Sequence, residues 1–170
     1  MKLQILTSRV MTLAAACAMA AAVDAADTPK SASATPNAKQ LARGQYVVKI
    51  GGCNDCHTPG YAPSGGKIPE KDWLVGDSLG WRGPWGTTYP VNLRLYMQTV
   101  SEQQWLSIAK TKEMRPPMPW FALRDMTEAD LKALYQYIRH LGPAGKPAND
   151  YLPPDKEPQP PFVQFPAPPK

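Results

Sequence analysis

The segment Cys53-Asn54-Asp55-Cys56-His57 is a Cys-x-x-Cys-His motif, and each of its three fixed residues has a chemical use. Two cysteines three positions apart lie on one face of a helical turn, so both sulfur atoms can bond to one edge of a porphyrin. The histidine follows at once, so its imidazole can reach the iron of a ring tethered in this way. The motif predicts one covalently attached haem c, bound through Cys53 and Cys56, with His57 as an axial ligand of the iron.

Other uses of a cysteine pair explain this motif less well. A structural zinc site needs four ligands, and beyond the leader described below the chain carries only these two cysteines, His57 and His140. A thioredoxin-like redox pair is expected within a βαβ pattern, which the sequence lacks. A disulfide between Cys53 and Cys56 leaves His57 without a role.

The composition is that of one folded domain with tails. The chain has 170 residues, of which 43% are hydrophobic, and its formal net charge is +5. The basic residues are spread out, without the cluster that nucleic-acid binding needs. Half of the 20 prolines follow Leu141, so residues 143–170 are predicted to be a proline-rich tail, either laid over the domain or free in solvent. Tyr151, Phe162 and Phe165 favour some docking of this tail.

Residues 1–25 have the pattern of a secretory signal peptide, in which basic residues precede an alanine-rich apolar stretch. We expect cleavage after Ala25 and a flexible linker over residues 26–37. Export to the periplasm fits the motif, because covalent haem attachment takes place outside the cytoplasm. A retained membrane anchor and lipidation of Cys17 are the alternatives.

Helical periodicity and capping residues predict three helices in a domain that spans residues 38–142. The first helix is expected from Asn37 or Ala38 to about Ile50, and the last from Thr127 to Leu141. Between them, Thr99 or Ser101 can cap a helix that runs to about Lys110. Gly44 is costly inside a helix and suggests the close approach of another element. Tyr137 in the last helix is a candidate to fill the gap that this glycine leaves.

The segment of residues 58–86 is dense in glycine and proline and is predicted to be a loop that wraps the edge of the haem. Trp73, Trp81 and Trp85 offer apolar cover, and their N–H groups can reach haem propionates. Ordinary core packing is the other use of each tryptophan. Residues 89–94 are expected to form a short extended link to the next helix.

Met118 is flanked by Pro117 and Pro119. Because proline fixes its own φ and biases the preceding residue towards extended geometry, this loop can hold the Met118 thioether against the iron as the second axial ligand. A methionine is by default a gap-filling core residue, so other residues remain open for the position. These are Met97, Met114, Met126 and His140.

Together, the Cys-x-x-Cys-His motif, Met118 in its loop and the capped last helix resemble class I c-type cytochromes over residues 38–141. The resemblance implies an all-α bundle around one haem, with histidine and methionine on opposite faces of the iron. It also implies that the first and last helices cross through a small residue and an aromatic, here Gly44 and Tyr137. Residues 89–119 are similar, more loosely, to haem modules of the cytochrome subunits of periplasmic dehydrogenases.

These features predict an electron-transfer protein rather than an enzyme, with one electron carried by a His/Met-ligated iron. The expected partners are redox proteins, such as a periplasmic dehydrogenase or a terminal oxidase, and the chain is either a free carrier or a subunit of such an assembly. The alternative is a haem enzyme or gas-binding protein with an open or displaceable sixth ligand. Candidates for steering an acidic partner are Lys67, Lys71, Arg94, Lys110, Lys112 and Arg115.

Overall fold

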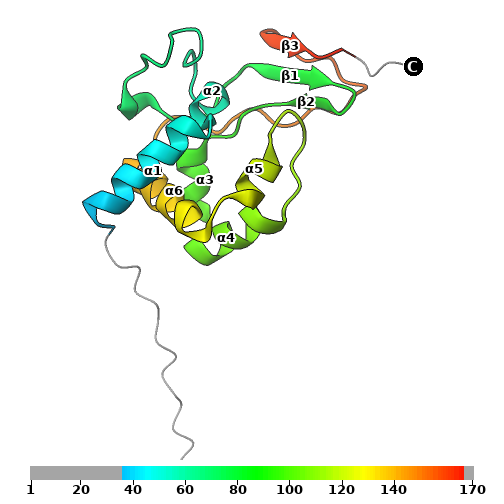
Figure 1. Ribbon diagram of the computed structural model, residues 1–170. Coiled ribbons are helices and arrows are strands. Elements are labelled where there is room, and N and C mark those ends of the chain that lie inside the picture. The colour runs from blue at the N-terminus through cyan, green and yellow to red at the C-terminus, as the bar shows by residue number, and fades with distance from the viewer. Residues whose placement is uncertain (1–35, 167–170) are drawn as a thin grey trace, which may run out of the picture. The chain divides into compact units, whose positions relative to one another are not determined.

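The computed structural model describes residues 36–166, which fold into helices with a small sheet at one side (Figure 1). The helices are α1 (Ala38–Ile50), α2 (Cys53–His57), the 3-10 turn η1 (Glu70–Asp72), α3 (Leu93–Thr99), α4 (Glu102–Thr111), α5 (Trp120–Asp125) and α6 (Glu128–Leu141). The strands are β1 (Gly80–Gly83), β2 (Gly86–Thr88) and β3 (Phe162–Gln164).

The predicted signal peptide and nearly all of the predicted linker lie outside the described residues. Within residues 36–166, none of the helices combines the length and the apolarity that a membrane span needs.

The three predicted helices are confirmed as α1, α4 and α6, the first predicted from periodicity and the other two with the help of capping residues. The side chain of Asn37 caps α1 and that of Ser101 caps α4, each within a reciprocal capping box. Thr127 accepts the amide hydrogen of Asp130 at the start of α6, and Gly142, whose positive φ of +70° suits glycine, ends this helix. These signals lie within four residues of each helix end, which is why the sequence alone located the ends.

The crossing of α1 and α6 is the most extensive contact between two elements and depends on Gly44. A Cβ atom on Gly44 would come within 3.0 Å of the Ala133 carbonyl oxygen and of Tyr137 Cβ. The predicted meeting of Gly44 with Tyr137 is therefore confirmed, because the two helix backbones approach too closely for any side chain at position 44.

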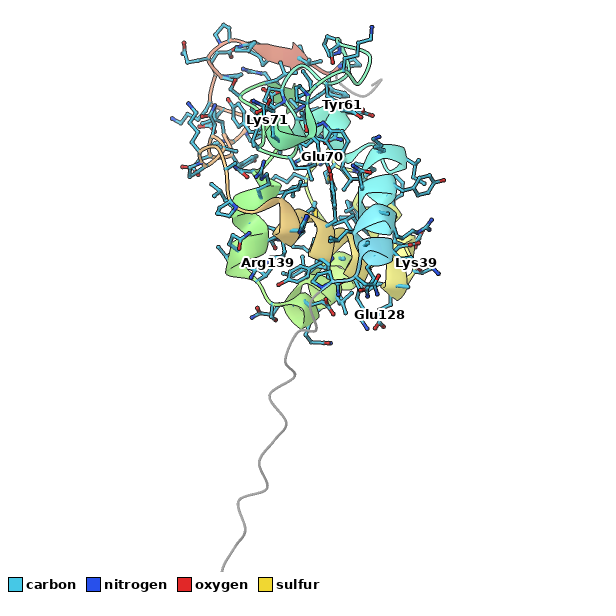
Figure 2. The ribbon with its side chains drawn as sticks, turned by 90° about the vertical axis from the view of Figure 1, so that its left-hand side faces the viewer. Lys39, Tyr61, Glu70, Lys71, Glu128 and Arg139 are labelled. Carbon is cyan, nitrogen blue, oxygen red and sulfur yellow. The ribbon has the colours of Figure 1, made fainter. Side chains whose placement is uncertain are left out.

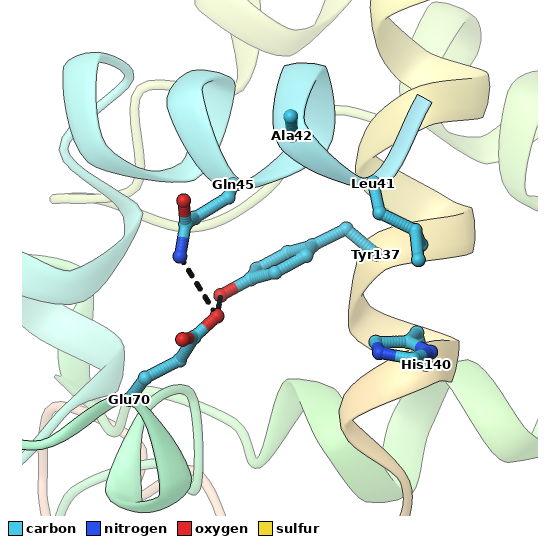
Figure 3. A pocket seen from close by; sticks show the side chains of 6 residues that line it. All are labelled: Leu41, Ala42, Gln45, Glu70, Tyr137 and His140. Carbon is cyan, nitrogen blue, oxygen red and sulfur yellow. Dashed lines mark hydrogen bonds between the residues drawn. The ribbon is translucent and has the colours of Figure 1, made fainter. Parts of the chain in front are cut away.

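The hydroxyl of Tyr137 reaches across to the segment that follows α2. It donates a 2.6 Å hydrogen bond to Glu70 Oε1, and Gln45 Nε2 donates to the same oxygen at 2.9 Å (Figure 3). Figure 2 shows Glu70 beside Lys71 and Tyr61, near the end of α1 that leads into α2 and away from Lys39. These bonds tie residues 58–76 to the helix crossing.

A single core cluster lies between α1, α3, α4 and α6. Its most buried members include Val48, Met97, Leu131 and Ile138, each with none of its surface exposed. Trp73 belongs to this cluster and donates its Nε1 hydrogen to the Ile68 carbonyl at 2.8 Å. For Trp73 the core-packing interpretation is thus confirmed.

The all-α class needs a correction, because three short strands form a sheet in the order β2-β1-β3. The hairpin of β1 and β2 is antiparallel, and β3 from the proline-rich tail pairs with β1 in parallel. The tail is therefore laid over the domain, and Phe165 packs against the rings of Trp81 and Trp85 at centroid distances of 6.0 and 5.2 Å. Strands of three or four residues leave no periodicity that a sequence pattern can reveal.

Two helices were not predicted. The segment of residues 89–94 was expected to be extended throughout, but α3 begins at Leu93, where Asn92 accepts the amide hydrogen of Leu95. The prolines before Trp120 likewise concealed α5, which has only six residues. Both helices are too short to show a repeating apolar face.

Replacing Gly44 with alanine is expected to lower the free energy of unfolding by about 2 kcal/mol, because the added methyl group meets the backbone of α6. Alanine is the better helix former by about 1 kcal/mol, so propensity alone predicts the opposite sign. Urea unfolding of the holoprotein measures the change. The control is Ala42→Gly at an exposed position of the same helix. A Gly44→Ala variant more stable than the wild type would contradict the close crossing.

Candidate haem-binding site

The motif cysteines lie on α2, directly after a turn of two glycines. Gly52 has φ +68°, a left-handed conformation that glycine adopts without strain, and α2 begins at the next residue. Cys53 and Cys56 are both half-buried and free of any disulfide. Both thiols are therefore available, at helical spacing, for the two thioether bonds that the motif predicts.

His57 is buried, and one hydrogen bond fixes the state of its ring. Its Nδ1 lies 2.8 Å from the carbonyl oxygen of Val91. A carbonyl oxygen can only accept, so Nδ1 must carry the proton, and Nε2 keeps a free lone pair. Burial lowers the pKa of His57 below its usual range and the bond to Val91 acts against this, so the neutral ring is favoured. A neutral imidazole held in this way is a metal ligand with an oriented Nε2.

The motif cysteines lie in partly buried surroundings. Burial raises the pKa of the Cys53 thiol to about 11, against a weaker effect of a backbone hydrogen bond. Burial also raises the pKa of Cys56, and the nearby charge of Asp55 adds to this. Apolar surroundings at α2 suit the porphyrin ring, and they disfavour a charged site.

A series of hydrogen bonds between buried polar groups holds α2 against the segment that follows it. Thr58 Oγ1 donates to Asn54 Oδ1 at 2.7 Å and accepts the amide hydrogen of Leu74 at 2.8 Å. The amide of Gly76 donates to the His57 carbonyl at 2.9 Å. Sequence reasoning missed this supporting role of Asn54 and Thr58. The available signal was the spacing of four between two polar residues, Asn54 on α2 and Thr58 directly after it.

Met118 lies in the segment between α4 and α5, residues 112–119, which we call the Met118 loop. The Met118 side chain is partly buried and packs against the same core cluster as Cys53. Its amide donates to the Arg115 carbonyl at 3.3 Å, and its own carbonyl accepts from Trp120 at 2.9 Å. The structure thus brings Met118 and Cys53 to one apolar cluster from two distant parts of the chain.

The other candidates for the second axial position differ in their surroundings. Met97 is fully buried inside the core, and His140 is exposed on α6. Met114 and Met126 are partly buried against the core cluster. Met126 Cε lies 3.4 Å from the place where a Cβ of Gly51 would be, so it packs at the end of α1.

Of the three tryptophans that are candidates to contact a haem, two have an acceptor for their indole N–H group and one has none within the described residues. Trp73 Nε1 donates to Ile68, as described above, and Trp85 Nε1 donates to the Trp81 carbonyl at 3.3 Å. Trp81 Nε1 is buried and has no partner within residues 36–166. Of the three indoles, Trp81 is therefore the one whose N–H still needs an acceptor.

Arg94 was predicted as a surface charge for partner steering, and this prediction is wrong. Its side chain is 94% buried, with 6% of the residue exposed, and donates to the carbonyls of Gly142 and Lys71, each at 2.6 Å, and to that of Leu141. A cation at the C-terminal end of α6 is favoured by the helix dipole and by three carbonyl acceptors. The other five predicted residues are exposed: Lys67, Lys71, Lys110, Lys112 and Arg115.

Comparison with known proteins gives one match. The family model for cytochrome c matches residues 41–142. The chain belongs to the cytochrome c family. No curated protein and no solved structure matches it. Members of this family bind haem c, typically through cysteines, and they are in general electron carriers with redox protein partners rather than enzymes. The six helices within residues 36–166 agree with this mainly helical fold, to which this chain adds the small sheet.

The donor groups at α2 fit the haem c of this family. Cys53 and Cys56 present two free thiols on one helical face, and His57 offers a neutral imidazole with Nε2 available. The Met118 thioether lies on the same apolar cluster as Cys53. Two cysteine thiols for thioether bonds and one nitrogen ligand are the groups that a covalently attached haem needs from its motif.

Replacing both Cys53 and Cys56 with serine is expected to abolish haem that survives denaturation, because neither side chain then forms a thioether. Each single variant should retain haem through one bond, and the α-band of its alkaline pyridine derivative should move to longer wavelength as one more vinyl group is kept. Haem staining of a denaturing gel and the pyridine spectra are the measurements. Denaturation-resistant haem in the double variant would contradict attachment at α2.

Proposed function

We propose that the mature protein is a periplasmic carrier of single electrons that holds one haem with His57 and Met118 as axial ligands. The observation that supports this most is the 2.8 Å bond from His57 Nδ1 to the Val91 carbonyl, since it leaves Nε2 as the free donor of an oriented ring. The position of Met118 in a proline-flanked loop against the core supports the second ligand.

Bound haem supplies an Fe(III)/Fe(II) couple, and the chain's part is to hold both ligands in both states. The Val91 carbonyl fixes the orientation of the His57 ring. Pro117 and Pro119 restrict the backbone on either side of Met118. A site whose ligands move little between oxidation states needs little reorganisation for electron transfer. Methionine opposite histidine and dry surroundings both favour the ferrous state.

Electron transfer requires transient contact with redox proteins. The five exposed basic residues named above are candidates to attract an acidic partner, in which case the association rate falls as salt is added. A dehydrogenase or a terminal oxidase is the class of partner we propose, with this chain as a free carrier or as a subunit. The loose similarity of residues 89–119 to dehydrogenase haem modules supports the subunit form.

We also propose that residues 1–25 are removed on export and that a single haem is attached. Only one Cys-x-x-Cys-His sequence occurs in the 170 residues, and Cys17 would be lost with the leader.

Intact mass spectrometry of protein released from the periplasm is expected to show the chain from Ala26 to Lys170 plus the mass of one haem. A protein that starts at Met1, or that carries a lipid at Cys17, would contradict cleavage after Ala25. Recovery in the membrane fraction would favour the retained anchor.

Replacing Met118 with alanine is expected to abolish the weak long-wavelength absorption band of sulfur-ligated ferric haem and to let the ferrous protein bind carbon monoxide. The physical reason is that the sixth position then lacks its protein ligand. Visible spectra of both oxidation states, with and without carbon monoxide, are the measurement.

The matched control is Met114→Ala, which removes a partly buried methionine from the same loop and should leave the band in place. If Met114→Ala loses the band and Met118→Ala keeps it, the ligand assignment is wrong. If the wild type lacks the band and binds carbon monoxide readily, the site is open, and a haem enzyme or gas-binding protein becomes the better proposal.

A further inference from the structure

The C-terminal segment of residues 143–166 is attached to the domain at several points. Near its start, Asn92 Nδ2 donates to the carbonyl of Ala144 at 2.8 Å. Farther along, Leu152 and Thr87 exchange two backbone hydrogen bonds, with N–O distances of 2.7 and 3.0 Å. The parallel pairing of β3 with β1 follows. The segment and the β1–β2 hairpin therefore form one unit.

Tyr151 connects this unit with the Met118 loop. Its hydroxyl donates to the Trp85 carbonyl in the hairpin at 2.8 Å. Its ring lies against the guanidinium of Arg115, whose central carbon is 3.9 Å from the ring centroid. Arg115 is also the residue whose carbonyl accepts the amide hydrogen of Met118. Two consecutive contacts therefore link the Tyr151 ring to the backbone of Met118.

A second bond from the hairpin reaches the next residue of the loop. Thr88 Oγ1 donates to the Pro116 carbonyl at 2.7 Å. At the other side of the loop, Lys110 Nζ donates to the Met126 carbonyl at 2.5 Å and so joins α4 to the end of α5. The β1–β2 hairpin thus holds the Met118 loop at Pro116, and the C-terminal segment holds it at Arg115. The Lys110 bond joins the two helices that flank the loop.

We propose that Tyr151 is a positioning residue for the methionine ligand: by holding Arg115 against the hairpin, it keeps the Met118 loop closed on the iron and so limits the binding of external ligands. The inference rests on the proposed function, because it assumes ligation by Met118. An external ligand binds only the open form of the loop, and its apparent dissociation constant varies inversely with the open fraction. Each contact that holds the loop closed should therefore raise that constant.

Imidazole titration of the ferric holoprotein tests the proposal, with the loss of the long-wavelength sulfur band as the signal. Tyr151→Ala removes both contacts and is expected to lower the apparent dissociation constant for imidazole about tenfold, which corresponds to ~1.4 kcal/mol. Tyr151→Phe keeps the ring on Arg115 and should lower it about threefold, since only the hydrogen bond to Trp85 is lost. Arg115→Gln should change the apparent dissociation constant for imidazole less in the Tyr151→Ala protein than in the wild type. The reason is that the two side chains act through one contact.

The matched control is Tyr46→Ala. Tyr46 is half exposed on α1, and its ring also faces an arginine, Arg43, with 5.2 Å between guanidinium carbon and centroid. Arg43 pairs with Asp130 on α6, and no hydrogen bond of the described residues joins this pair to the Met118 loop, so the variant should bind imidazole as the wild type does. Urea unfolding of each variant separates a general loss of stability from a change in the loop.

Two results would overturn the inference, and they differ in what else they affect. If the wild type shows the sulfur band but Tyr151→Ala and Tyr151→Phe both bind imidazole with the wild-type constant, Tyr151 has only a structural role and ligation by Met118 stands. If the wild type itself lacks the band and binds imidazole as tightly as Met118→Ala, the proposed ligation fails and the inference fails with it.

Discussion

The close crossing of α1 and α6 at Gly44 is the constraint on which the rest of the structure depends. Helix α1 leads through two glycines into the haem motif, and α6 leads directly into the C-terminal segment. The crossing therefore determines the positions at which the haem motif and the C-terminal segment begin. The hydroxyl of Tyr137, from the same crossing, also holds Glu70 and with it the segment that supports His57. A side chain at position 44 would disturb all three connections at once.

The family assignment and the donor set agree on what kind of protein this is. The cytochrome c family binds haem c, and this chain presents two free thiols and a histidine whose protonation is set by one backbone carbonyl. The added sheet and the docked C-terminal segment distinguish this chain from a bare helical bundle. They place Tyr151 and Thr88 against the Met118 loop, so the additions bear on the haem site as well as on the fold.

The features that the sequence predicted well are local. Asn37, Ser101 and Thr127 mark helix starts through bonds to residues three positions away, and the Cys-x-x-Cys-His motif is complete within five residues. What was missed depends on distant partners. Strand β1 needs β3, some 80 residues later, and Arg94 is buried only because carbonyls from two other segments surround it. A charged residue without visible partners is expected at the surface, and here that expectation was wrong.

Ligation of the iron by the Met118 thioether can be tested by NMR of the ferrous protein with isotope-labelled methionine methyl groups. Residues 36–166 contain four methionines, Met97, Met114, Met118 and Met126. A methyl group held over the haem face is shifted far upfield by the ring current. If Met118 is the ligand, the wild type shows one such signal and Met118→Ala shows none. A spectrum without a shifted methyl signal, or a shifted signal that persists in Met118→Ala, would contradict it.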